Sequence, residues 1–433
     1  MPGEEGAQGR RAALPIFLIV SLFFLWGAAH NLNDVLVAQF RKAFQLGDLQ
    51  SGLVQSAFYL GYFFFAFPAA LVMRRYGYKA GVVLGLILFG GGALLFWPAA
   101  ELKAYGAFLA ALFVIASGLA FLETSANPLV LALGRPETGA GRLLLAQAFN
   151  PAGSIVGVLI SRQFIFSGVE PSSAELAAMS PTDLARFSGA EAHAVQLPYL
   201  VIGGFVLAWA VLIALTRFPP LATAPSLTTE GLRADLGRLL RRPRFLMGVM
   251  AQFFYVGAQV GVWSYLIRYA QAETGVGEKT AASYLILCLA AFAVGRFSGA
   301  ALMTRFRPDR LAGVYAVINV ALCLVGALAG GTVGLWALVA ASFFMSVMYP
   351  TIFTLSVESL GPLTKLGSAL LVMAIVGGAA ITAVMGAVSD ASSIAIAMAV
   401  PAACFAMVAV FAWTARRSAA ASPADIAVAA PAP

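Results

Sequence analysis

Two carboxylates stand inside segments that are otherwise apolar enough to cross a membrane: Asp34 in FLWGAAHNLNDVLVAQF and Glu123 in AFLETSANPLV. A charged side chain within hydrocarbon costs from roughly 2.5 to over 10 kcal/mol. Neither segment contains a Lys or Arg that could neutralise the acid, and an unpaired buried carboxylate takes up a proton near neutral pH. The pair therefore predicts proton handling, with a purely structural role as the alternative.

Polar side chains accompany both carboxylates at helical spacing. His30 and Asn31 precede Asp34 by four and three residues, so one helix face would carry all three. Asn127 follows Glu123 by four residues. A single amide in a membrane helix more often joins two helices, but repeated polar faces favour a shared polar cavity.

Proline follows two of the amides directly. Pro128 comes after Asn127 and predicts an interruption of that helix, because proline has no backbone N–H to donate. Gln147 and Asn150 lie three residues apart in LLLAQAFNPAGS, again before a proline. A freed backbone carbonyl must find a partner inside the protein or in cavity water.

The second half of the chain supplies an aromatic counterpart. The segment AQFFYVGAQVGVWSYLIRY places four side chains on one helix stripe, namely Gln252, Tyr255, Gln259 and Trp263. Tyr349 precedes Pro350 at a predicted helix break, and such breaks often line transporter sites. Aromatic faces stack on the C–H surface of sugars and amides bind hydroxyl groups. An interfacial aromatic belt is the alternative, but belts cluster at helix ends.

The elements that carry these residues are membrane-spanning helices. The chain has 433 residues, of which 61% are hydrophobic and 11% charged, against about 25% charged in soluble domains. A span needs about 20 mostly apolar residues, and this length predicts an all-α membrane protein. The twelve predicted spans are 13–39, 50–73, 79–99, 104–133, 142–168, 195–217, 244–271, 280–303, 310–330, 333–358, 365–388 and 392–415.

A polar linker divides the spans into two sets of six. The predicted units are an N-terminal bundle (1–217), a cytoplasmic linker (218–243), a C-terminal bundle (244–417) and a disordered cytoplasmic tail (418–433). Similar basic segments, MRRYGYKAGV and MTRFRPDRLAGV, recur at the same place in both halves, as in transporters built from parallel repeats. The distribution of Lys and Arg places both termini in the cytoplasm.

Other functional classes have little support in the sequence. No GxxxxGK[ST] phosphate loop is present, and the two histidines are too few and too distant to form a metal cluster. No nucleophile and base stand at catalytic spacing, so we predict no enzyme activity. The basic residues fit membrane orientation better than nucleic-acid binding. Outside the spans, MSPTDLARF predicts a short external helix with Ser180 as its cap.

Several strings together resemble the fucose–proton symporters of the major facilitator superfamily, in the branch that includes fucose, glucose and galactose carriers. They are FLWGAAHNLNDVLVAQF, SGLVQSAFYLGYF, FLETSANP, LAQAFN, YVGAQVGVWSYLIRYA and YPTIFTL. The resemblance covers nearly all of both halves. It implies twelve transmembrane helices in two pseudo-symmetric six-helix bundles, with a central cavity that opens alternately to each side of a bacterial inner membrane.

The resemblance also implies roles for individual residues. Asp34 and Glu123 fall on the family's acids for coupled proton and sugar movement. The implied sugar contacts are Asn31, Gln147, Asn150, Gln259, Tyr349 and, less directly, Trp263. His30 replaces an arginine of the family one turn from Asp34, so with Asn127 it is expected to tune the site.

We therefore expect a monosaccharide–proton symporter that imports L-fucose or a related hexose, with no cofactor and with the proton as coupling ion. Glucose, galactose or N-acetylglucosamine with the same or different ion coupling is the alternative, followed by a membrane sugar sensor and a proton-driven drug exporter. The expected partners are the sugar and the lipid bilayer, and the expected functional form is a monomer.

Overall fold

A computed structural model of the chain describes residues 17–28, 36, 39–40, 43–44, 48–133, 136–160, 175, 178–218, 229–358 and 360–419. Within these ranges, ten helical segments are long and apolar enough to cross a membrane, and each overlaps one of the predicted spans. The other two predicted spans, 13–39 and 142–168, extend past the described residues. Their described parts are the apolar helix Phe17–Ala28 and the consecutive helices α6 and α7.

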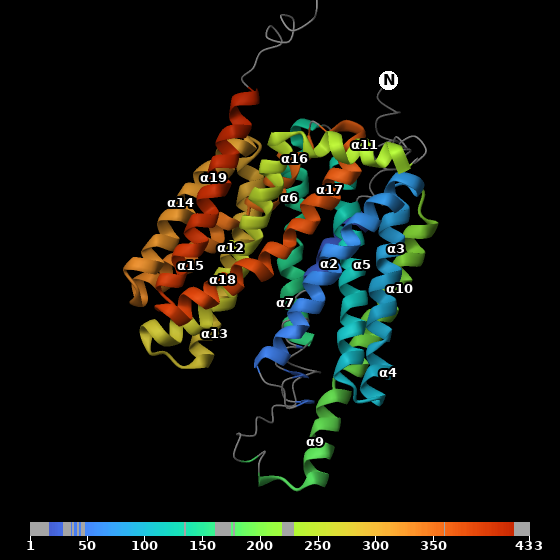
Figure 1. The fold of residues 1–433 in the computed structure, drawn as a ribbon, viewed down its shortest axis with the longest axis vertical. Helices are drawn as coiled ribbons and strands as arrows, with labels where there is room; N and C mark the ends of the chain where they lie inside the picture. Colours follow the sequence, from blue (N-terminus) through green and yellow to red (C-terminus); the bar gives the residue numbers. More distant parts are fainter. Residues whose placement is uncertain are drawn as a thin grey trace, which may run out of the picture. The chain divides into compact units, whose positions relative to one another are not determined.

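The chain divides into two compact units (Figure 1). Unit 1 contains Met1–Leu133, Ala146–Leu227 and Ser368–Met373, and unit 2 contains Gly134–Leu145, Thr228–Gly367 and Ala374–Pro433. The domain limits expected from the sequence stay a prediction.

Unit 1 is built around a central helix, α5, which packs along both α2 and α3, while α10 covers α3. Glycines allow this close approach: a Cβ atom added at Gly118 would clash with the backbone of Phe89 on α3. The helices of unit 1 with their bounds are α2 (Asp48–Tyr76), α3 (Tyr78–Leu94), α4 (Phe96–Glu101), α5 (Tyr105–Ala132), α7 (Asn150–Ile160), α9 (Pro181–His193) and α10 (Gln196–Leu215).

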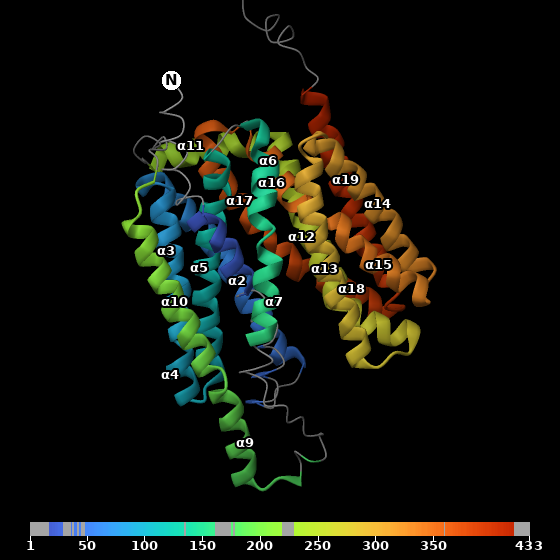
Figure 2. The ribbon, with the colours of Figure 1, turned by 180° about the vertical axis from the view of Figure 1, so that it is seen from behind.

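Unit 2 has α12 at its centre, in contact with α13, α15, α16, α18 and α19 (Figure 2). Its helices are α11 (Thr229–Leu240), α12 (Pro243–Thr274), α13 (Glu278–Leu302), α14 (Pro308–Leu328), α15 (Gly331–Met345), α16 (Met348–Val357), α18 (Gly377–Ala391) and α19 (Ala399–Ala419). Helices α6 (Gly139–Gln147) and α17 (Thr364–Met373) each belong partly to both units, and short 3-10 turns are Pro136–Thr138, Gly361–Leu363, Ala374–Val376 and Ile396–Met398.

The same packing device occurs in both units. A Cβ atom at Gly153 of α7 would clash with the carbonyl oxygen of Phe24, and one at Gly377 of α18 with the carbonyl oxygen of Phe253. Each glycine lies in the first turn of the second helix of an interrupted span. Its missing side chain lets that helix contact the backbone of the first span in the same unit. Only a residue without a side chain fits there, so both crossings are fixed by sequence.

Prolines stand at the interruptions of two spans, whereas α2 continues through Pro68 and α5 through Pro128. Pro151 and Pro350 lie in the first turns of α7 and α16, where a backbone N–H would have no partner within the helix. The interruption predicted at Pro128 is wrong, because α5 continues through this residue. Residues 115–130 of α5 are all buried, so packing on every side holds the helix together despite the missing hydrogen bond.

Helix α9 begins as the sequence predicts. Ser180 caps it by accepting a hydrogen bond from the backbone N–H of Asp183 at 3.2 Å. Near its end, Glu191 joins α9 to the described end of the first span: Gln39 Nε2 donates to the Glu191 carboxylate at 2.6 Å and to its carbonyl oxygen at 2.9 Å. Both side chains are buried.

Candidate functional site

The first predicted span bears three candidate residues outside the described ranges. Asp34, Asn31 and His30 all lie in the segment 29–35, and their predicted roles stay predictions. The described helix before them is anchored at Gly27, where a Cβ atom would clash with the carbonyl oxygen of Asn150. Ser154 Oγ also donates to the Gly27 carbonyl at 3.3 Å.

Glu123 lies on α5 in the interior of unit 1, with 5% of its surface exposed. The Tyr62 hydroxyl of α2 is hydrogen-bonded to its carboxyl group. Trp26 Nε1 in turn donates to the Tyr62 hydroxyl at 2.9 Å. Glu123 is therefore linked to the helix Phe17–Ala28 through hydrogen bonds of Tyr62.

Two of the predicted amides meet directly. Gln147 Nε2, at the end of α6, donates to Asn127 Oδ1 of α5 at 3.3 Å. Both side chains are buried, and Asn150 is half-buried at the start of α7. Asn127 lies one turn from Glu123 on α5, so unit 1 places a carboxyl group and two amides in adjacent turns.

Trp263 of α12 belongs to an aromatic cluster in unit 2. Its indole Nε1 donates to Ser342 Oγ at 3.1 Å, and its ring meets the ring of Phe292 edge-on with centroids 5.0 Å apart. The Arg296 guanidinium carbon lies 4.6 Å from the centroid of the Phe292 ring, a distance at which a cation is attracted to an aromatic face. Arg296 therefore contacts Phe292, which in turn contacts Trp263.

Tyr349 lies beside Tyr255, with ring centroids 6.3 Å apart. The Tyr255 hydroxyl donates to the carbonyl oxygen of Met345 at 3.0 Å, at the interruption between α15 and α16. Gln252, one turn earlier on α12, is fully buried, and its amide has no hydrogen-bond partner among the described residues. Gln259 is half-buried further along α12.

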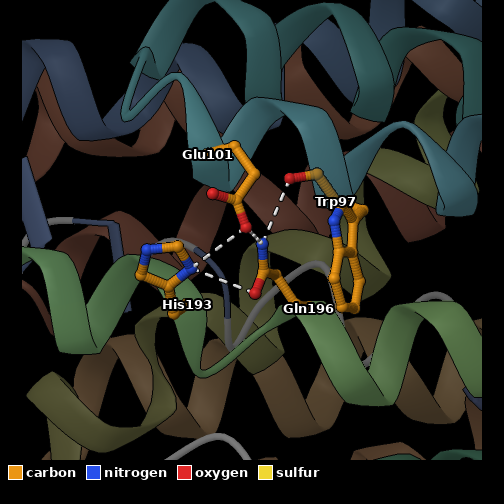
Figure 3. Close-up of polar contacts among 4 residues, drawn as sticks. All are labelled: Trp97, Glu101, His193 and Gln196. Carbon is orange, nitrogen blue, oxygen red and sulfur yellow. Dashed lines mark hydrogen bonds and ion pairs between the residues drawn. The ribbon is translucent and has the colours of Figure 1, made fainter.

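A contrasting carboxylate lies at the end of α4 (Figure 3). Glu101 is more than half exposed and accepts a hydrogen bond from Gln196 Nε2 at 3.0 Å, while His193 Nδ1 is 4.0 Å from the same carboxylate oxygen. Gln196 also donates to the Trp97 carbonyl at 3.2 Å. This cluster joins α4 to α9 and α10, and the exposure of Glu101 makes it a matched control for the buried Glu123.

Sequence reasoning missed two residues beside Glu123 and one buried carboxylate elsewhere in unit 1. Trp26 and Tyr62 were not singled out, although polar-ended aromatic residues in the middle of apolar spans were a usable signal. Glu191 was treated as part of an external loop, yet it is buried. Among the described residues, no group of three or more His, Cys, Asp and Glu could hold a metal ion.

Three comparisons place the chain among known proteins. The Major Facilitator Superfamily model matches residues 18–383. The L-fucose-proton symporter of Escherichia coli (strain K12) is 47% identical over 94% of both chains. The glucose/galactose transporter of Brucella abortus is 35% identical over 94% of this chain and 95% of its own. The crystal structure of FucP in the outward conformation matches with a TM-score of 0.86, covering 94% of this chain and 99% of FucP.

These matches confirm the predicted fold class, an all-α membrane protein with twelve transmembrane helices in two pseudo-symmetric six-helix bundles.

Proposed function

Because the chain belongs to the major facilitator superfamily, we propose that it is a secondary active transporter that imports a monosaccharide, L-fucose or a related hexose, together with a proton. The observation that carries the proposal is the 47% identity over 94% of both chains with an L-fucose-proton symporter. The burial of Glu123 in a helix long enough to span a membrane supports it.

Proton coupling is assigned to Glu123 and Asp34. A carboxylate in an apolar interior is disfavoured when it is charged, so protonation lowers the free energy of closing water out of the site. In the proposed cycle the protein takes up a proton and then sugar from outside. It changes conformation with the acid neutral, and releases both to the cytoplasm. Return of the empty carrier completes the cycle.

Sugar recognition is assigned to amide and aromatic side chains, namely Asn31, Gln147, Asn150, Gln259, Tyr349 and Trp263. Amides both donate and accept hydrogen bonds, which suits a ring of hydroxyl groups. Trp263 is held by Ser342 and Phe292, so its ring loses little freedom when a sugar stacks on it. Asn127 tunes the site by its hydrogen bond with Gln147, and the same role is assigned to His30, which precedes Asp34 by four residues in the sequence.

The cellular setting follows from the same proposal. The protein works as a monomer in the lipid bilayer of a bacterial inner membrane, with both termini in the cytoplasm, and it needs no cofactor beyond the proton.

Purified protein in proteoliposomes tests the proposal. Addition of L-fucose without an imposed gradient should make the external medium alkaline, because each imported sugar removes a proton. A panel of galactose, glucose, arabinose and N-acetylglucosamine, measured in the same way, ranks the substrates. Sugar uptake that is robust and moves no protons would overturn symport, and binding without any flux would indicate a sensor.

The second candidate substrate class is glucose or galactose, which the Brucella abortus relative favours. Competition against labelled L-fucose uptake separates the two. Strong inhibition by galactose, with weak inhibition by unlabelled L-fucose, would indicate that galactose is the preferred substrate. The proton-coupled mechanism would be unaffected.

A further inference from the structure

Three elements of unit 1 meet at the Tyr62 hydroxyl. Tyr62 is 2% exposed on α2, Trp26 is 7% exposed on the helix Phe17–Ala28, and Glu123 is 5% exposed on α5. Helices α2 and α5 cross closely at the neighbouring Gly61, where a Cβ atom would lie 2.9 Å from the Phe113 carbonyl oxygen. The hydroxyl is therefore held between Trp26 and Glu123 by the packing of the backbone.

The hydrogen-bond chain has a fixed direction. An indole N–H can only donate, so Trp26 occupies an acceptor position on the Tyr62 oxygen at 2.9 Å. The hydroxyl proton is then available to donate to Glu123, its other hydrogen-bonded partner. A carboxylate accepts such a bond more strongly than a neutral carboxylic acid does.

From this geometry we propose that Tyr62 is a positioning residue for Glu123, and that Trp26 sets the direction of its hydrogen bond. The inference deepens the proposed function, since it rests on Glu123 as a carrier of the transported proton. Tyr62 holds the carboxyl group in one orientation and favours its ionised form, which promotes proton release after sugar has left. Trp26 acts only through Tyr62.

The charged surroundings of Tyr62 are sparse within the described part of unit 1. Glu123 and Tyr59 are the titratable groups that act on it. The helix Phe17–Ala28 and α7 have no titratable side chain in their sequences. The other titratable groups on these helices and on the neighbouring α3 lie toward helix ends: Asp48, Arg74, Arg75 and Tyr76 of α2, Tyr105 of α5, and Tyr78 and Lys79 of α3.

The pH profile of L-fucose uptake by Tyr62→Phe proteoliposomes tests the inference. Loss of one charge-assisted hydrogen bond should shift the alkaline limb of the profile upward by about one pH unit, equivalent to about tenfold in proton affinity. Tyr59→Phe, which removes a hydroxyl one turn away on the same helix, is the matched control and should shift it far less. Equal shifts in the two variants would overturn the inference.

Infrared titration of the protonated carboxyl band gives a readout that needs no transport. The band that disappears in Glu123→Gln should titrate at higher pH in Tyr62→Phe and, to a smaller extent, in Trp26→Phe. The double variant should match Tyr62→Phe alone, since Trp26 acts through Tyr62. Trp26→Phe leaves Tyr62 in place, and its own shift of the Glu123 band keeps the test available if Tyr62→Phe folds poorly.

The outcomes separate the two proposals. Additive shifts in the double variant, or an unmoved Glu123 band, would overturn the positioning role and leave symport standing. Coupled accumulation that survives Glu123→Gln would overturn the proposed role of Glu123 in symport, while a shifted band would still support the Tyr62 contact.

Discussion

The segments Glu123–Pro128 of unit 1 and Met345–Pro350 of unit 2 have corresponding positions in the two bundles and different chemistry. In each segment the proline comes five positions after the first residue. Unit 1 places a carboxylate first and an amide, Asn127, before the proline. Unit 2 places a thioether first and an aromatic hydroxyl, Tyr349, before the proline.

The two helices also respond differently to proline. Helix α5 continues through Pro128, whereas the span of Pro350 is interrupted between α15 and α16. At the interruption the Tyr255 hydroxyl donates to the Met345 carbonyl oxygen at 3.0 Å, and this bond takes the place of a backbone donor. A side chain of α12 thus stabilises the broken span of unit 2.

The buried charged side chains also differ between the two units. The buried charged side chains of the described part of unit 1 are the carboxylates Glu123 and Glu191, whereas those of unit 2 are the cations Arg296 and Lys365 and the carboxylate Asp309, which forms an ion pair with Arg307. The fold is repeated but the chemistry is not. We infer that unit 1 is specialised for the proton, and that the described interior of unit 2 is specialised for an aromatic sugar-binding surface.

The largest expected effect comes from Glu123→Gln, which keeps the shape of the side chain and removes the titratable proton. Accumulation of sugar against its gradient should be lost, while sugar exchange at equilibrium persists. In proteoliposomes, net uptake measures the accumulation and counterflow measures the exchange. The control Glu101→Gln removes a carboxylate of the same unit that is exposed, and it should accumulate sugar normally. Full accumulation by Glu123→Gln would break the assignment of the proton to unit 1.

The shared packing device predicts a matched pair of stability losses. In Gly153→Ala and Gly377→Ala the new methyl group meets a backbone carbonyl oxygen. Overpacking of this kind lowers stability by about 1–3 kcal/mol or more. The melting temperature in detergent should fall in both variants. Gly91→Ala is the control, because a Cβ atom at Gly91 meets no atom within 4 Å. A loss confined to one unit would show that the repeat is less symmetric than its glycines indicate.

The hydrophobic pattern predicted the spans well because a bilayer imposes both their length and their composition. Ten predicted spans overlap described helices, and the cap at Ser180 followed from local hydrogen bonding alone. Pro128 shows where local rules fail. Its effect depends on neighbours that surround α5 from distant parts of the chain, and no local pattern reports them.

The sequence predicted which residues belong to the candidate site better than it predicted the contacts between them. Glu123 and Gln147 stood out because polar groups are rare in apolar segments, and both are buried. Their partners were harder to foresee. The Tyr62 hydroxyl reaches Glu123 only because α2 and α5 cross at Gly61, and Tyr255 finds Met345 from a helix about 90 residues away in sequence.

A third prediction concerns the broken span of unit 2. Tyr255→Phe removes the hydroxyl that donates to Met345 and leaves a buried carbonyl oxygen without this donor, which lowers stability by about 1–3 kcal/mol. Tyr284→Phe is the control, because the Tyr284 ring packs on the half-exposed Trp336. The melting temperatures of Tyr255→Phe and Tyr284→Phe, measured with and without sugar, show which variant is less stable. If Tyr255→Phe is as stable as the control, the hydroxyl does not replace the backbone donor.

The smallest expected effect is on sugar affinity. Trp263→Phe keeps an aromatic ring beside Phe292 but loses the N–H bond to Ser342 and part of the stacking surface. The KM for uptake should rise about fivefold, equivalent to about 1 kcal/mol of binding free energy. The number of protons moved per sugar should not change, because the acids of unit 1 are untouched. Trp336→Phe removes an indole that is 50% exposed and should leave KM as it was. A change in the proton-to-sugar ratio in Trp263→Phe would place part of the coupling in unit 2 and end the division of labour inferred from buried charge.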